Sequence, residues 1–214
     1  MAVIAPCITV ETEDDYKATV ERLHPFAQRV HIDLMDGEFA PTFSIGVDKI
    51  WWPQEWIVDV HAMVSRPSQY VDALIQLHPS TVIFHVEVEE DLTPTITKLK
   101  QAGIKAGVAL LKPTVPSEVS NYIEIADHVL VFSGDLGHYG GVASLMQLEK
   151  VRLVRKIHPE VEVGWDGGAN AENVFSLVQG GVDVVNCGGS INKAPDPTGA
   201  YKLMVEEINK HSVI

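Results

Sequence analysis

Cysteine is scarce in this chain, because only Cys7 and Cys187 occur among its 214 residues. Each lies in an apolar, strand-like run, which argues against a disulfide framework and indicates a reducing, cytoplasmic setting. Long apolar runs are lacking too: none approaches the roughly 18 residues that a membrane-spanning helix needs. The chain also starts without the charged and apolar pattern of a secretion signal. We expect a cytoplasmic protein without a membrane partner.

Basic residues are few, with 16 Lys and Arg against 29 Asp and Glu, and the formal net charge is −13 at pH 7. No run of basic residues interrupts this acidic background, so the sequence argues against a nucleic-acid partner. An anionic small molecule would have to be held locally by backbone N–H donors, such as those of glycine-rich turns.

The chain does contain a regular alternation of short apolar runs and amphipathic intervals. Its composition, 46% hydrophobic and 21% charged, is typical of a globular protein and predicts one domain over residues 1–214. The apolar runs read as parallel strands buried on both faces. They number eight, which favours a closed (βα)8 (TIM) barrel, an α/β fold, over an open doubly wound sheet. The expected strands are 3–9, 29–34, 57–61, 81–86, 105–110, 128–132, 161–165 and 183–187, and the main helical intervals are 14–26, 68–77, 93–103, 116–126, 145–158 and 171–180.

Three of these strands carry titratable residues near their carboxyl ends. His31 and Asp33 are two positions apart on one strand, so their side chains point to the same side. His61 and Asp166 fall at the ends of two other strands. In a (βα)8 barrel these ends converge on the face that carries the reactive groups. Two imidazoles and two carboxylates can hold one divalent metal cation there, and zinc, manganese, iron and cobalt all suit such a set.

Asp33 and Asp166 also suit proton transfer next to a carbonyl group. A divalent ion stabilises the negative charge that grows on the carbonyl oxygen when the neighbouring carbon loses a proton. Inversion at that carbon needs a base on one face and an acid on the other, which two carboxyl groups from different strands supply. The sequence therefore predicts Asp33 and Asp166 as the catalytic pair.

Three segments resemble the ribulose-phosphate 3-epimerase family: His-Ile-Asp-Leu-Met-Asp-Gly at 31–37, Asp-Val-His-Ala-Met at 59–63 and Trp-Asp-Gly-Gly at 165–168. The resemblance implies an isomerase of carbohydrate metabolism in the pentose phosphate pathway, which interconverts D-ribulose 5-phosphate and D-xylulose 5-phosphate. It also implies that His31, Asp33, His61 and Asp166 bind the metal and that the two aspartates shuttle protons. The substrate and phosphate contacts that it implies are Cys7, Met35, His61, Met63, Gly140, Gly141, Gly168, Gly189 and Ser190.

The chain departs from the family pattern at two places. The loop after the sixth strand usually reads Asn-Pro-Gly-Phe-Gly-Gly in the family, whereas residues 133–141 here lack the proline and are one residue longer before the final glycine pair. A substrate-contacting serine of the family is Cys7 here, and a thiol is a weaker hydrogen-bond partner. These departures leave two alternatives open: an epimerase for another ketose phosphate, such as allulose 6-phosphate, or a catalytically silent sugar-phosphate binding relative.

Two further enzyme classes fit the sequence less well. A barrel decarboxylase would carry a lysine within the segment 31–36, which has none, and a metal hydrolase fits the same ligands without an identifiable leaving group. His85 and Glu87 are expected to support the metal ligands or to serve as structural polar groups. The phosphate turns contain no obvious Lys or Arg, which predicts a neutral backbone nest. The tryptophans at 51, 52 and 56 indicate a packed excursion or a homo-oligomer contact.

Overall fold

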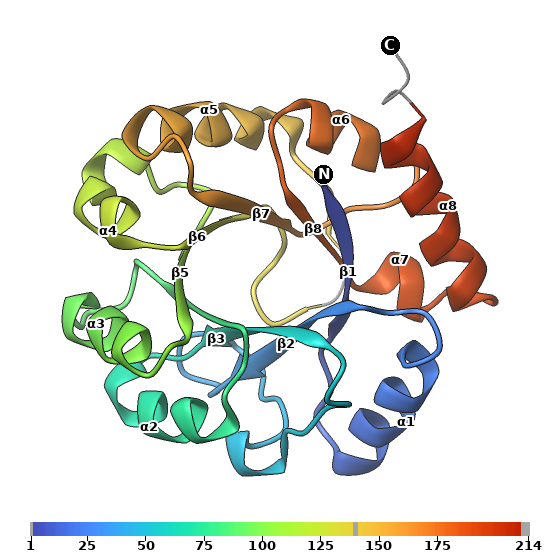
Figure 1. Ribbon diagram of the computed structural model, residues 1–214, viewed down its shortest axis with the longest axis horizontal. Coiled ribbons are helices and arrows are strands. Elements are labelled where there is room, and N and C mark those ends of the chain that lie inside the picture. Colours follow the sequence, from blue (N-terminus) through green and yellow to red (C-terminus); the bar gives the residue numbers. More distant parts are fainter. Residues whose placement is uncertain (1, 139–140, 211–214) are drawn as a thin grey trace.

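A computed structural model describes residues 2–138 and 141–210 of the chain. Eight parallel strands close into a barrel in which each strand pairs with the next and the last pairs with the first. In Figure 1 the strands surround the centre and the helices form the outer ring. The predicted (βα)8 barrel is therefore confirmed. The strands are β1 (Val3–Ile8), β2 (Arg29–Met35), β3 (Ile57–Met63), β4 (Thr81–His85), β5 (Lys105–Leu110), β6 (His128–Phe132), β7 (Glu162–Asp166) and β8 (Val184–Cys187).

The described residues form eight α-helices and three short 3-10 helices. Two α-helices follow β8, and the connection between β2 and β3 holds only a 3-10 turn. The α-helices are α1 (Glu13–Leu23), α2 (Pro67–Leu77), α3 (Thr93–Gln101), α4 (Ser120–Ile125), α5 (Leu148–Ile157), α6 (Val174–Gln179), α7 (Gly189–Asn192) and α8 (Pro197–Asn209), and the 3-10 helices are η1 (Val47–Lys49), η2 (Pro116–Val119) and η3 (Leu145–Gln147). None of these helices is long and apolar enough to cross a membrane.

Local sequence signals explain where several helices begin. The Thr12 hydroxyl oxygen accepts a hydrogen bond from the Asp15 N–H and caps α1, whose first turn is acidic. The 13-residue helix α8 lies outside the helical intervals that the sequence predicted. It nevertheless has a clear start, because the Asp196 side chain accepts from the Gly199 N–H and Pro197 occupies the first turn.

The barrel has an apolar shell and a partly polar interior. The large hydrophobic cluster gathers the outward side chains of the strands and the inward faces of the helices. Inside the barrel, Ile83, Ala109 and Leu130 form a small separate cluster. Side chains alternate between these two environments along each strand. This alternation directs His31 and Asp33 into the barrel, where both are buried.

A charged network lies at the amino end of the barrel, away from the expected site. Arg29 Nε donates to Asp59 Oδ2 over 2.6 Å, and the rest of the guanidinium donates to both carboxylate oxygens of Glu162 over 2.7 and 2.9 Å. His128 Nδ1 lies 2.8 Å from Glu162 Oε2. Burial alone would raise the pKa of Glu162, but the hydrogen bonds from Arg29 and His128 lower it well below its usual range.

Candidate active site

Four side chains form a compact cluster at the carboxyl ends of β2, β3 and β7. One donor atom from each of His31, Asp33, His61 and Asp166 lies within 4.8 Å of the others. The nearest pairs are Asp33 Oδ1 with His61 Nδ1, at 3.2 Å, and with His31 Nε2, at 3.3 Å. Neither ring nitrogen of the buried His31 has a hydrogen-bond partner among the described residues. An imidazole without a partner, facing two carboxylates, fits a divalent metal site.

A buried relay behind His61 fixes which of its nitrogens faces the cluster. His61 Nε2 lies 2.8 Å from His85 Nε2, and His85 Nδ1 lies 3.2 Å from Glu87 Oε2. The Glu87 carboxylate is itself held by the Leu111 N–H over 2.8 Å and by the Thr114 hydroxyl. An ionised carboxylate only accepts, so His85 Nδ1 carries the hydrogen and His85 Nε2 accepts from His61. The lone pair of His61 Nδ1 is thereby directed towards Asp33 and Asp166.

Charge and burial support this assignment of the relay. Burial lowers the pKa of His85 to about 4, against a smaller opposite effect of its hydrogen bond with Glu87. The ring is therefore neutral near pH 7 and retains an accepting nitrogen. Burial alone would raise the pKa of Glu87, but its hydrogen bonds with His85 and Thr114 lower it, which keeps the carboxylate ionised.

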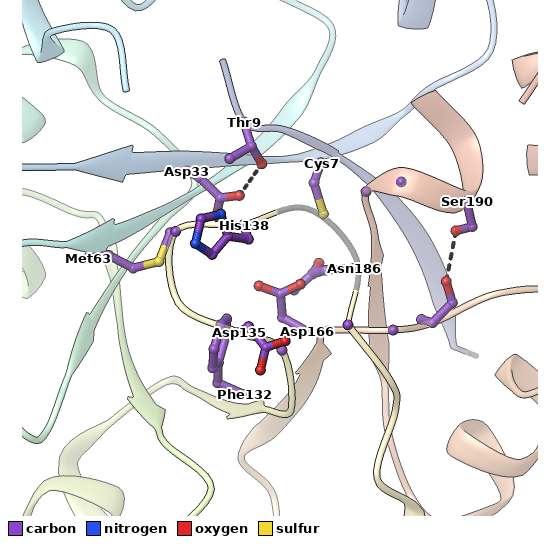
Figure 2. Close-up of a pocket in the computed structure, with 18 of the residues that line it drawn as sticks. Cys7, Thr9, Asp33, Met63, Phe132, Asp135, His138, Asp166, Asn186 and Ser190 are labelled. Carbon is purple, nitrogen blue, oxygen red and sulfur yellow. Dashed lines mark hydrogen bonds between the residues drawn. The ribbon is translucent and has the colours of Figure 1, made fainter. Parts of the chain in front are cut away.

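The two aspartates of the cluster lie in different electrostatic environments. Burial alone would raise the pKa of Asp33, but the neighbouring imidazoles of His31 and His61 lower it well below its usual range. Asp33 Oδ2 also accepts a hydrogen bond from the Thr9 hydroxyl, drawn in Figure 2. Burial raises the pKa of Asp166, and the nearby charge of Asp33 raises it further. Two carboxyl groups with pKa values moved in opposite directions are typical of acid and base partners.

A cavity of about 300 Å³ opens beside this cluster. Asp33, Asp166, Met35 and Met63 line its inner end, and turns after β7 and β8 line another wall. Figure 2 shows the Asp166 carboxylate pointing into the space that these residues surround. The volume is at the lower end of the range for small-molecule sites, which suits a compact substrate.

Backbone turns form the wall that the sequence predicted as a phosphate cradle. Gly168 adopts a φ of +72°, and a Cβ there would lie 2.2 Å from the Ala143 nitrogen, so only glycine fits. Gly189 and Ser190 follow β8 and begin α7, where the first N–H groups of a helix lack partners within the helix. The Ser190 hydroxyl donates to the Ala169 carbonyl over 2.8 Å, which ties this turn to the one after β7.

The loop between β6 and η3 lies against the segment that follows β2. Leu136 packs on the buried cluster of Met35, Ala40 and Met63. The Thr42 hydroxyl donates to the Gly137 carbonyl over 2.8 Å. His138 from this loop also lines the cavity. The described part of this loop, although its sequence differs from the family pattern, therefore packs through Leu136 against residues at the ends of β2 and β3.

The structure brings most of the predicted site residues to one cavity. Asp33 and Asp166 lie on its wall, in contact with the buried His31 and His61. The other predicted contacts that line it are Cys7, Met35, Met63, Gly141, Gly168, Gly189 and Ser190. Gly140 lies outside the described residues.

Sequence reasoning missed several polar side chains on the cavity wall. Lys193 lies beside the turn of Gly189 and is the one Lys or Arg side chain among the described lining residues. The neutral nest stays a prediction for the turns themselves, because Lys193 follows the turn rather than lying in it. Thr9 and Asn186 are two others. Thr9 is two residues after Cys7 and so points to the same side, and Asn186 is paired with Asp166 across β7 and β8. Their inward orientation depends on the register of β1 and β8.

Comparison with known proteins agrees with this geometry. The sequence model of the family described as "Ribulose-phosphate 3 epimerase family" matches residues 3–192. The chain belongs to the ribulose-phosphate 3-epimerase family. Family membership places it among the isomerases, in a family of metalloenzymes. The cluster of His31, Asp33, His61 and Asp166 provides a site that could hold the metal.

Curated relatives match the chain over most of its length. A ribulose-phosphate 3-epimerase of Oryza sativa, a cytoplasmic isoform, is 30% identical over 204 residues, which cover 92% of this chain and 90% of that protein. The ribulose-phosphate 3-epimerase of Helicobacter pylori is 31% identical over 188 residues, or 84% of each chain. That of Mycobacterium leprae is 31% identical over 189 residues, or 83% of each.

Solved structures share the fold at lower identity. A 3-hexulose-6-phosphate synthase from Salmonella typhimurium superposes with a TM-score of 0.75 at 17% identity, covering 98% of this chain and 99% of that one. An orotidine 5'-phosphate decarboxylase from Pyrococcus horikoshii gives a TM-score of 0.68 at 15% identity, covering 97% and 99%. These likenesses show the barrel fold and no more.

Proposed function

We propose that this chain is a metal-dependent 3-epimerase that interconverts D-ribulose 5-phosphate and D-xylulose 5-phosphate. The observation that carries the proposal is the cluster of two histidines and two aspartates at one end of a small cavity that has glycine turns on another wall. The named relatives act on ribulose phosphate, which favours this substrate. Allulose 6-phosphate remains the alternative substrate, because the loop after β6 differs from the family pattern.

The metal would be held by His31, Asp33, His61 and Asp166. When bound, a divalent ion supplies Lewis-acid stabilisation of the negative charge that develops on the substrate ketone oxygen. The His85 relay holds the His61 ring with Nδ1 towards the site, and the Thr9 hydroxyl holds Asp33 from the other side. Zinc, manganese, iron and cobalt are all compatible with this donor set.

Asp33 and Asp166 would perform the inversion at carbon 3. One aspartate, as carboxylate, takes the proton from carbon 3, and the electron pair of that C–H bond moves into a planar enediolate. The other aspartate, as carboxylic acid, returns a proton to the opposite face of the same carbon. The two residues come from β2 and β7 and approach the cavity from different sides (Figure 2), as the two-face chemistry requires.

The phosphate group would lie against the turns after β7 and β8. Backbone N–H groups at Gly168, Gly189 and Ser190, together with that of Gly141, suit an anion. Lys193 adds a positive charge at the rim of this wall. Without it, the charged lining residues among those described are the carboxylates Asp33, Asp135 and Asp166, and these repel a phosphate dianion.

A catalytically silent sugar-phosphate binder is the second candidate, and the altered loop is the observation that favours it. The complete set of four metal donors and the buried relay behind His61 favour the enzyme. We further propose that the protein acts in the cytoplasm and forms homo-oligomers through the β2–β3 excursion, where the Trp51 side chain is 48% exposed.

The test is a turnover assay of the purified protein loaded with each of the four metals in turn. NMR of carbon-labelled D-ribulose 5-phosphate should show D-xylulose 5-phosphate forming with at least one metal and stopping on chelation. D-allulose 6-phosphate, assayed in parallel, decides between the two substrates by the ratio of kcat/KM. Binding of ribulose 5-phosphate without conversion under every metal would contradict the epimerase and favour the silent binder.

A further inference from the structure

A buried carboxamide on the cavity wall takes no part in the proposed metal and proton-transfer chemistry. Asn186 lies on β8, is 1% exposed and lines the cavity. Neither its Nδ2 nor its Oδ1 has a hydrogen-bond partner among the described residues. Figure 2 shows the side chain next to Asp166.

An amide buried without partners is costly to the folded protein. It loses its hydrogen bonds to water and gains none in return, and native proteins rarely leave both atoms of such a group unsatisfied. An apolar side chain of the same shape, such as leucine, would fill the position without this cost. A carboxamide on a cavity wall is thus best explained by a polar group of the ligand that it contacts.

The position of Asn186 indicates which part of the ligand it would contact. It pairs with Asp166 in the register of β7 and β8, and with Ala5 in that of β1 and β8. Two residues later the chain enters the turn of Gly188 and Gly189. Asn186 therefore lies between the carboxyl group that faces the reacting carbon and the turn that faces the phosphate.

The neighbouring strand β1 offers no comparable hydrogen-bonding side chain, because Ala5 is paired with Asn186 and Cys7 is the next residue on the same side. Cys7 of β1 also lines the cavity, and burial raises the pKa of its thiol well above the usual value, so the group is a neutral thiol. A thiol is a weak donor and a weak acceptor, whereas a carboxamide has two N–H donors and a carbonyl acceptor. Of the two side chains, Asn186 is the one equipped to bind a hydroxyl group.

We propose that Asn186 determines specificity by hydrogen-bonding the hydroxyl group on carbon 4 of the phosphorylated ketose. This inference rests on the proposed function, because it takes carbon 3 as the reacting atom and the glycine turns as the phosphate site. Carbon 4 lies between carbon 3 and the carbon that bears the phosphate in a pentulose 5-phosphate. Asn186 occupies the corresponding place on the wall.

The test measures binding of a ligand that cannot react. D-Ribitol 5-phosphate has the carbon 4 hydroxyl but no ketone, and its 4-deoxy analogue lacks only that hydroxyl. Calorimetric titration of the metal-loaded wild-type protein should give about 10- to 100-fold tighter binding of ribitol 5-phosphate than of the 4-deoxy analogue. In Asn186→Leu the preference for ribitol 5-phosphate should disappear. The variant should lose affinity for ribitol 5-phosphate only, and should bind the 4-deoxy analogue as the wild type does.

Two further variants guard against a general packing effect. Cys187→Ala changes the next residue of β8, which belongs to the outer hydrophobic cluster, and should keep the wild-type preference. Asn186→Val provides a second apolar replacement if the leucine variant fails to fold. The role of Asn186 would be overturned if the apolar variants kept the preference for ribitol 5-phosphate. It would also be overturned if they lost affinity equally for both ligands.

The outcomes separate this inference from the proposed function. A wild-type protein that fails to epimerise any ketose phosphate, yet shows the Asn186-dependent preference, refutes the proposed activity and supports the contact. A protein that epimerises ribulose 5-phosphate but binds both polyol phosphates equally refutes the contact and supports the activity. Binding of neither ligand overturns the inference.

Discussion

The His61–His85–Glu87 relay makes a quantitative prediction about metal affinity. In His85→Phe the aromatic ring remains, so its packing against Phe39 and Phe132 is largely preserved. The ring no longer accepts the hydrogen bond from His61 Nε2. His61 then has a buried donor without a partner and loses the constraint that directs Nδ1 towards the cluster.

The size of the effect follows from the burial of the pair. Both rings are 0% exposed, so water cannot replace the lost acceptor. A buried donor left unsatisfied costs about 1–3 kcal/mol. Loss of such a supporting contact typically weakens metal binding by about 10- to 100-fold, which is about 1.4–2.8 kcal/mol and agrees with that cost.

Competition with a chromophoric chelator at pH 7 measures this affinity directly. We expect His85→Phe to bind zinc about 10- to 100-fold more weakly than the wild type. The matched control is His128→Phe, which replaces another buried histidine at the opposite end of the barrel, where it contacts Glu162. The role of the relay would be refuted if His85→Phe bound zinc as tightly as the wild type. It would also be refuted if His85→Phe and His128→Phe lost zinc affinity equally.

Three further predictions follow from the same structure. Lys193→Met should raise the KM for the ketose phosphate by about 3- to 10-fold with little change in kcat, since an exposed charge contributes about 1 kcal/mol, whereas Lys202→Met should not. Gly168→Ala should lower the melting temperature and raise KM together, because the new Cβ meets the backbone at Ala143; an unchanged KM would remove this turn from the cradle. Glu162→Gln should flatten the acid dependence of stability: the lowered pKa of Glu162 stabilises the fold above pH 4.5 and this contribution is lost as the pH falls below it. Urea unfolding at pH 3–6 checks this, and parallel wild-type and variant curves would contradict it.

The strands and the cluster of candidate metal ligands were predictable because the alternation of side chains along a strand is a local property of the sequence. The spacing of His31 and Asp33 directs both side chains inward whatever the partner strand is, and the structure bears this out. The eight apolar runs predicted the barrel for the same reason, with ends that differ by a few residues. Strand β7, for example, runs to Asp166 rather than stopping before it.

The missed features depend on contacts between distant segments. Lys193 reaches the cavity only because the short helix α7 follows its turn, and the periodicity that marks longer helices is weak over four residues. The 13-residue helix α8 contains a glycine and a proline that obscured its pattern. The Thr9 hydroxyl meets Asp33 across the β1–β2 pair, a partnership that is fixed by strand register.

Hydrogen exchange at carbon 3 in deuterated water tests the central claim most directly. With metal-loaded wild-type protein, NMR should show deuterium entering carbon 3 of D-ribulose 5-phosphate as D-xylulose 5-phosphate forms. Asp33→Asn and Asp166→Asn should each abolish epimerisation while keeping the fold, because inversion needs a carboxyl group on both faces. Formation of xylulose 5-phosphate at the wild-type rate in either variant would contradict the two-aspartate account.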